Sequence, residues 1–287
     1  MGPSSSSDLS RSAILAALYH DPLPVGGVAV ALLLGTYGLF GLPVDLPLLV
    51  AGFCGTALAY LVDRAWMPAP EDRINRPGRV AWVQSHAGWL AAETVVLVAL
   101  GGAMVPYLQW ATLAWTGALG GIAGVHVLLR SRERTSLLGI PKPVAIAGAW
   151  AAGGALLPLV EAGRPIGGEA LLFSGYRGLF ILPNLLLADW ADRAGDAAVG
   201  LAPWASGWTG RQVRRLATAS LLGAALGAAG WAVVASQPVL VGIDAVGLLL
   251  MMGVVWGLDP TQPRTALLAD LVVGWPLIPA LTAWMIV

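Results

Sequence analysis

Three aspartates fall within the eight residues Asp189-Trp-Ala-Asp192-Arg-Ala-Gly-Asp196. On a helix, a spacing of i, i+3 and i+7 places the three carboxylates on one face. Like charges this close repel one another and resist removal from water, so a cation should offset them. Magnesium prefers hard oxygen ligands and bridges readily to a phosphate-bearing substrate. The stretch therefore favours a site for a metal and a polyanion. The alternative is a solvated helix end that Arg193 neutralises in part.

A second acidic stretch begins at Asp63 and runs on into Asn75-Arg76-Pro77. Guanidinium groups bind phosphate oxygens in pairs, so arginines beside a carboxylate suit a metal and a diphosphate. The alternative is an interfacial charge followed by a basic loop that serves only membrane topology. The residues of this stretch that bear on the chemistry, besides Asp63, are Trp66, Met67, Asp72, Arg73, Asn75 and Arg76.

The composition indicates where these residues must be held. Of the 287 residues, 57% are hydrophobic and 11% are charged, whereas about 25% of a typical soluble domain is charged. The 16 basic and 16 acidic residues cancel, so no basic field attracts nucleic acid. A single cysteine, Cys54, excludes an intramolecular disulfide. The sequence predicts an all-α, polytopic membrane protein.

Nine stretches are long and apolar enough to cross a membrane, since a spanning helix needs roughly 20 residues. We expect a single transmembrane domain over residues 1–287, in which residues 1–22 form a cytoplasmic or interfacial segment. The predicted spans are 23–41, 45–63, 82–105, 107–129, 143–162, 167–190, 214–235, 238–258 and 266–287.

The basic residues predict the orientation. Of the 16 Lys and Arg residues, all but Arg164 and Arg177 fall before the first predicted span or in alternate loops. By the positive-inside rule that face is cytoplasmic. We therefore expect a multi-pass protein of the cell (inner) membrane, with a cytoplasmic N-terminus and an outer C-terminus. Both acidic stretches lie on the cytoplasmic face in this topology.

Nine helices with acidic stretches after the second and the sixth resemble the UbiA superfamily of intramembrane prenyltransferases. The second motif of that family is D-x-x-D-x-x-x-D followed by a glycine, and it is matched in register by Asp189, Asp192, Asp196 and Gly200. The first motif is N-x-x-x-D-x-x-x-D, commonly followed by N-R-P. It keeps Asp63 and Asn75-Arg76-Pro77, while Ala59 and Met67 replace its outer residues.

The resemblance implies a fold, an activity and a set of site residues. It implies nine helices around a central cavity and a Mg²⁺-dependent transferase that ionises an isoprenyl diphosphate and passes the prenyl group to an aromatic or lipid acceptor. The catalytic and metal-binding residues it implies are Asp63, Asp189, Asp192 and Asp196. The implied diphosphate-binding residues are Arg73, Asn75, Arg76, Arg130, Arg134, Lys142 and Arg177. Trp66, Met67, Asp72, His126 and Trp190 would line the cavity.

Three other functions stay open. A terpene cyclase on the same scaffold needs no acceptor, and a non-catalytic isoprenoid- or lipid-binding protein would explain the degenerate first motif. A transporter is the third, although its acids would lie at the midplane rather than at one face. Arg177 lies inside a predicted span, so it either lines the pocket or pairs with an acid such as Glu93 or Glu169. Asp244 and Asp270 either touch the acceptor or pair between helices, and His126 also suits a structural hydrogen bond.

Overall fold

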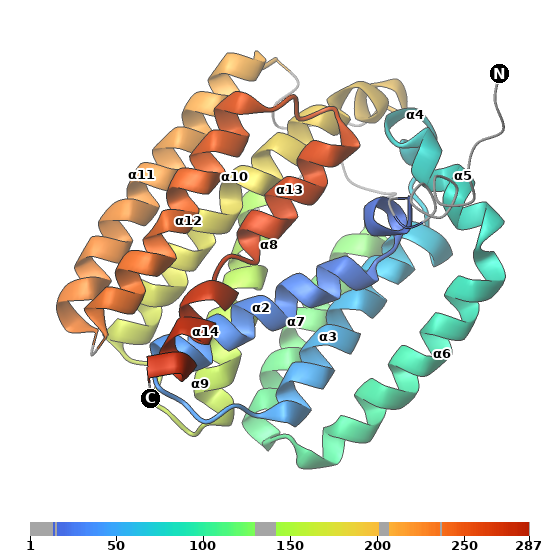
Figure 1. The fold of residues 1–287 in the computed structure, drawn as a ribbon. Helices are drawn as coiled ribbons and strands as arrows, with labels where there is room; N and C mark the ends of the chain where they lie inside the picture. The colour runs from blue at the N-terminus through green and yellow to red at the C-terminus, as the bar shows by residue number, and fades with distance from the viewer. Residues whose placement is uncertain (1–13, 15, 130–141, 201–206, 236, 287) are drawn as a thin grey trace, which may run out of the picture.

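The computed structural model describes residues 14, 16–129, 142–200, 207–235 and 237–286, and these residues form helices and connections without any strand (Figure 1). Seven of the described helical segments are long and apolar enough to cross a membrane, and Leu23–Leu39 is a shorter apolar helix. The predicted all-α membrane class is therefore confirmed. The count of nine spans stays a prediction.

Each predicted span coincides with a helix or a pair of helices. Two π-helical turns and one 3-10 turn extend them: η1 (Val62–Trp66), η4 (Ala152–Leu156) and η2 (Val105–Tyr107). The α-helices are α2 (Leu23–Leu39), α3 (Leu46–Leu61), α4 (Asp72–Asn75), α5 (Pro77–Ser85), α6 (Ala87–Met104), α7 (Trp110–Leu129), α8 (Lys142–Ala151), α9 (Leu157–Glu161), α10 (Gly168–Ala198), α11 (Gly210–Val234), α12 (Pro238–Gly257), α13 (Pro263–Val273) and α14 (Leu277–Ile286).

The helix boundaries differ from the predicted spans at three places. Helix α10 continues past position 190 to Ala198, and a separate helix, α5, begins at Pro77 before the third span. The last predicted span is two helices, because the turn Gly274-Trp275-Pro276 interrupts it. Apolarity reports the part of a helix inside the bilayer, whereas charged and alanine-rich turns can stay helical beyond it.

Helix α2 lies across the middle of the bundle and packs against α3, α14 and η4 (Figure 1). Two glycines allow the approach to the last helix. A Cβ on Gly38 would lie 2.6 Å from the Cα of Ala280, and one on Gly35 would meet Pro276. The long helix α10 packs against α11 and α8, and its final turns also contact the short helix α4. These two helices therefore connect most of the bundle.

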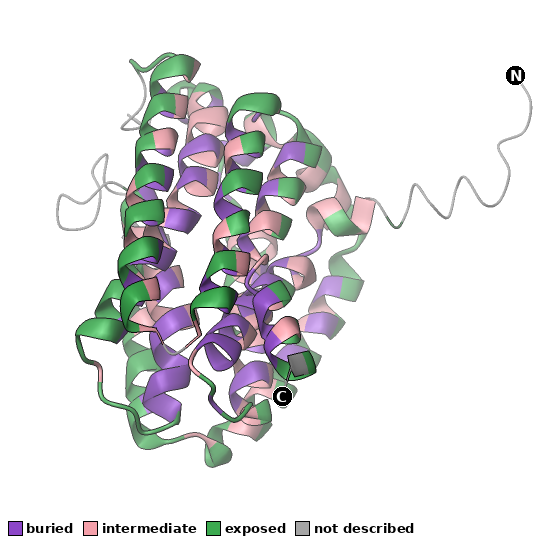
Figure 2. Ribbon diagram, turned by 60° about the vertical axis from the view of Figure 1, so that its left-hand side comes forward, coloured by how far each residue is buried: buried purple, intermediate pink, exposed green. Residues whose placement is uncertain are grey.

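The outer faces of the helices carry exposed residues and the inner faces carry buried ones (Figure 2). Large apolar side chains lie on the outside, such as Leu226 and Val233 of α11 and Leu249 of α12. A soluble protein rarely exposes apolar surface on this scale, whereas a lipid bilayer accepts it. The pattern agrees with a membrane location.

Candidate functional site

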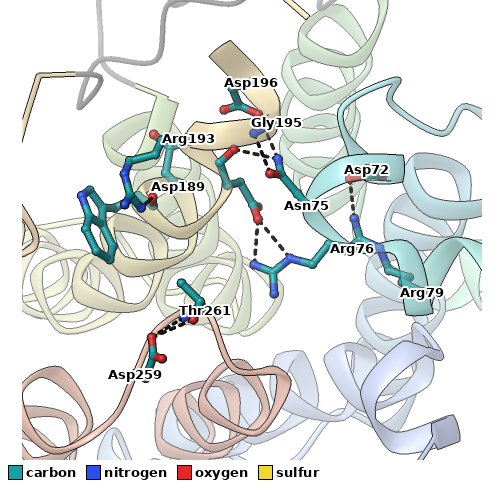
Figure 3. Close-up of polar contacts among 12 residues, drawn as sticks. Asp72, Asn75, Arg76, Arg79, Asp189, Arg193, Gly195, Asp196, Asp259 and Thr261 are labelled. Carbon is teal, nitrogen blue, oxygen red and sulfur yellow. Dashed lines mark hydrogen bonds and ion pairs between the residues drawn. The ribbon is translucent and has the colours of Figure 1, made fainter. Parts of the chain in front are cut away.

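The end of α10 and the short helix α4 meet at one end of the bundle (Figure 3). The last three turns of α10 bring Asp189, Asp192 and Asp196, and α4 with the residue after it brings Asn75 and Arg76. The structure thus brings Asn75 and Arg76, at the end of the stretch that begins at Asp63, to the three aspartates of α10.

Asn75 makes three hydrogen bonds to the end of α10. Its Nδ2 donates to the backbone oxygen of Asp192 at 2.7 Å and to Asp196 Oδ1 at 3.4 Å. Its Oδ1 accepts from the backbone N–H of Gly195 at 2.8 Å. Both ends of the amide group are therefore engaged with α10.

Two arginines of the same segment form ion pairs. Arg76 donates through Nε to Asp192 Oδ1 at 3.0 Å, and its Nη2 lies 2.9 Å from the same oxygen. Arg79 donates through Nη2 to Asp72 Oδ1 at 2.6 Å. Because Asp72 is buried and paired in this way, it holds α4 to α5.

The other cation beside the carboxylates comes from α8. Lys142 Nζ lies 3.7 Å from Asp189 Oδ1. Arg193, by contrast, turns to Trp190: its guanidinium carbon lies 3.7 Å from the ring centre, and Nη1 donates to the Trp190 carbonyl. In the described contacts, Arg76 and Lys142 rather than Arg193 face the cluster, and Arg193 covers a face of the Trp190 ring.

The acidic stretch that begins at Asp63 leaves α3 through η1, the π-helical turn that contains Asp63. Asp63 is half-buried there, and the turn packs mainly against α3 and α5. Trp66 is 53% exposed and donates through Nε1 to Thr94 of α6, and Met67 is 44% exposed. Arg73 is exposed on α4. The structure therefore brings Asn75 and Arg76 to the second motif and leaves the role of Asp63 as a prediction.

A narrow pocket lies between the end of α10 and α13. Its polar lining residues are Arg76, Asn184 and Thr265, and the remainder are Leu187, Ala188, Pro260, Ala266 and Ala269. Asn184 donates to Asp270 Oδ1 at 2.8 Å, so Asp270 pairs between α10 and α13. The guanidinium that holds Asp192 thus also borders an apolar recess. The larger central cavity implied by the resemblance stays a prediction.

Arg177 is not brought to this end of the bundle. It is 2% exposed inside α10, where Nη1 lies 3.0 Å from Oδ1 and 2.9 Å from Oδ2 of Asp244 on α12. Tyr176 donates its hydroxyl to Asp244 Oδ2 at 2.7 Å. Arg177 therefore pairs with an intramembrane acid, as one of the two alternatives expected, but the acid is Asp244 rather than Glu93 or Glu169. Glu93 lies on α6, whereas α12 packs against α10, and Glu169 lies at the start of α10 itself. A diphosphate-binding role for Arg177 stays a prediction.

Some predicted residues cannot be placed. Arg130 and Arg134 lie outside the described residues, and so does the side chain of His126, whose backbone is part of α7. Two residues of the site were missed. Arg79 was counted only as a topology signal. Gly195 has no functional side chain. Its position between Asp192 and Asp196 was the one feature of the sequence that could have pointed to it.

The donor chemistry of the cluster suits Mg²⁺, which prefers carboxylate oxygens. Among the described residues no three His, Cys, Asp or Glu side chains converge on one point as a closed metal cage. Mg²⁺ usually keeps several waters and binds one or two carboxylates together with substrate phosphates, so it does not require such a cage. The oxygen donors present are thus of the type that Mg²⁺ binds, and a magnesium ion at this site stays a prediction.

Two groups outside the spans have shifted pKa values. Burial and the positive charges of Arg79 and Arg64 lower the pKa of His20 below its ordinary value of 6.5. The backbone N–H and the hydroxyl of Thr261 donate to Asp259, and these hydrogen bonds lower the pKa of that exposed carboxyl. His20 is therefore neutral at pH 7, and Asp259, which Figure 3 shows with Thr261, is ionised.

Comparison with known proteins gives one solved structure of similar fold. No family model and no curated protein matches the sequence. The chain superposes on a digeranylgeranylglyceryl phosphate synthase, studied in membranes, with a TM-score of 0.58 and 12% sequence identity. The match covers 96% of this chain and 99% of the other. At this identity the likeness shows the fold alone.

Proposed function

We propose that the protein is an intramembrane prenyltransferase, which ionises an isoprenyl diphosphate and transfers the prenyl group to an aromatic or lipid acceptor. The observation that supports this most is that Asn75 and Arg76 contact two of the aspartates at the end of α10, Asp192 and Asp196. The likeness of the whole chain to a digeranylgeranylglyceryl phosphate synthase adds support through the fold.

The first task of such an enzyme is to bind a diphosphate next to carboxylates. Arg76 and Lys142 supply positive charge beside Asp192 and Asp189, and both side chains can turn to phosphate oxygens. Mg²⁺, when held by Asp192, Asp196 and Asp189 with the predicted help of Asp63, would supply Lewis-acid neutralisation of the leaving group. The cations of the chain itself would orient the diphosphate and offset its charge.

The second task is to keep an allylic cation away from water. The mainly apolar side chains next to Arg76 would contact the first carbons of the prenyl chain, since each CH₂ group removed from water contributes about 0.8 kcal/mol. The diphosphate would therefore lie at the Arg76 end and the tail between the helices. In the predicted topology this end faces the cytoplasm.

Purified protein in lipid nanodiscs tests the proposal. Geranyl, farnesyl and geranylgeranyl diphosphate are offered with Mg²⁺, with and without an aromatic or lipid acceptor, and pyrophosphate release is measured. Release that depends on an acceptor supports transfer, and release without one indicates a terpene cyclase instead. Binding without release would contradict both enzymes and leave an isoprenoid-binding protein. Asp192→Asn is the control that must remove any true signal.

A further inference from the structure

Asn75 is an unusual residue at this site because all the described hydrogen bonds of its side chain go to α10. The amide donates to one backbone oxygen and accepts from one backbone N–H, at 2.7 Å and 2.8 Å, and reaches one carboxylate at 3.4 Å (Figure 3). A carboxylate of the same shape has no donor, and an alkyl group has neither donor nor acceptor. Glutamine adds one carbon to the reach. Asparagine is thus the residue type that fits both backbone groups from α4.

Gly195 provides the matching half of the contact. Its backbone is ordinary helix, whereas the described glycines with positive φ are Gly41, Gly163 and Gly200. Glycine is less favourable than alanine inside a helix, so its presence here needs another reason. A Cβ on Gly195 would meet Cγ, Oδ1 and Nδ2 of Asn75 more closely than real Cβ atoms approach their neighbours. The missing side chain is therefore what admits the Asn75 amide.

We infer that Asn75 is a positioning residue: its amide, seated on Gly195, clasps α4 to the last turns of α10 and fixes where the carboxylates of Asp192 and Asp196 lie. We call these contacts among Asn75, Gly195, Asp192 and Asp196 the Asn75 clasp. The inference rests on the proposed function for its catalytic consequence, but the clasp itself does not. It replaces the expectation that Asn75 binds the diphosphate directly.

The clasp and the neighbouring arginine together position Asp192. Asp192 is held from two sides, with its backbone oxygen on Asn75 and its carboxylate on Arg76, the next residue of the chain. One short segment therefore sets both the height and the rotation of that side chain. Misplacement of a reacting group by about 1 Å costs roughly 100-fold in rate, so loss of the clasp should appear mainly in turnover.

The test uses full-length protein in nanodiscs and two separate readouts. The variants are Asn75→Ala, Gly195→Ala and the double variant, with Gly175→Ala as the matched control, since Gly175 lies in the same helix with open space around its Cβ position. Hydrogen–deuterium exchange of peptides covering 70–77 and 190–198 reports the clasp without any substrate. Steady-state kinetics with farnesyl diphosphate report its consequence.

Both single variants should raise exchange in both peptides and lower kcat by roughly 10–100-fold, with KM for the diphosphate changed much less. Because both changes break the same contact, the double variant should be no worse than Asn75→Ala. Gly175→Ala should match the wild type in both readouts.

Three results would overturn the inference. One is unchanged exchange in both single variants, and another is a double variant whose defects multiply. The third is a rise in KM in Asn75→Ala with normal exchange, which would make Asn75 a diphosphate ligand. If the wild type showed no turnover, the proposed function would fail while the exchange pattern still decided the clasp. If Gly195→Ala did not fold, Asn75→Ala, which adds no bulk, would decide it.

Discussion

Arg76 and Asp192 meet on a single carboxylate oxygen, with Nε at 3.0 Å and Nη2 at 2.9 Å from Oδ1. Neither contact uses Oδ2. The two side chains are 17% and 34% exposed, so water screens the pair and its contribution to stability is small. The value of the pair lies in orientation, since a carboxylate held by one oxygen can offer the other to a substrate-bound cation.

Replacement of Arg76 by lysine should lower kcat/KM for the prenyl diphosphate by roughly tenfold, equivalent to about 1.4 kcal/mol. Lysine keeps the charge, but its ammonium cannot place two donors on Oδ1 as the planar guanidinium does. Arg164→Lys, at an exposed arginine outside the site, is the matched control. Wild-type kinetics in Arg76→Lys would mean that only the charge matters.

Asp192→Asn and Asp196→Asn should each remove Mg²⁺-dependent turnover by at least roughly 100-fold, because each loses a charged oxygen ligand near the diphosphate. Expression and the elution volume in detergent should stay normal. Glu169→Gln, at the exposed start of the same helix, should keep full activity. Near-normal turnover in both aspartate variants would refute the assignment of the site.

Asp63→Ala should reduce turnover less than Asp192→Ala, because Ala59 and Met67 stand where the motif that this stretch resembles has its other two oxygen ligands. A thioether is a poor ligand for Mg²⁺. Calorimetric titration of Mg²⁺ in the presence of inorganic pyrophosphate should show one dominant binding event. Two equally strong Mg²⁺-binding events that are both lost in Asp63→Ala would contradict this prediction, because the stretch around Asp63 would then bind metal as strongly as the end of α10.

Arg177→Met and Asp244→Leu should each destabilise the protein by about 3–5 kcal/mol, because each leaves a buried charge without its partner. The double variant should lose much less than the sum, since no charge then stays uncompensated. Thermal unfolding in detergent, followed by tryptophan fluorescence, measures the effect. Additive losses would indicate that the two side chains are stabilised by separate contacts.

The lowered pKa of His20 predicts that the stability of the folded protein falls at acidic pH. The folded protein takes up this proton less readily than the unfolded chain, whose histidine has the ordinary value of 6.5. Stability should therefore fall as the pH drops below 6.5 until the folded pKa is passed, and the group should have no effect above 6.5. His20→Gln should flatten the melting temperature between pH 7 and pH 5. An unchanged slope would place the acid sensitivity elsewhere.

The sequence was a good guide to the helices and a partial guide to the site. Apolar runs predict helices of the membrane class because burial in lipid follows composition, and the spacing of Asp189, Asp192 and Asp196 places them along one helix. The predicted span stopped at 190, short of the last turns of α10, because the charged residues of those turns lower the apolarity of that stretch. The break at Gly274-Trp275-Pro276 was missed because apolar residues surround it.

Pairings between helices were the part that sequence could not supply. Arg177 needed a partner, as a charge inside a span does, but Asp244 became that partner only because α12 packs beside α10. Asn75 was noticed through its neighbours Arg76 and Pro77, and its actual contact, the backbone of Gly195, depends on how α4 lies over α10. Such contacts depend on how the helices pack, so the spacing of residues along the sequence does not reveal them.

The glycine contacts of Gly35 and Gly38 with α14 have a consequence for biogenesis. Helix α2 is synthesised well before Pro276 and Ala280, which follow α13 in the chain and fill the space beside those glycines. Until then that face of α2 must be covered by lipid, by the insertion machinery or by a chaperone. A ribosome that stalls after α12 would therefore leave this face of α2 without the residues that pack against it. Quality-control proteases should recognise the unpacked face.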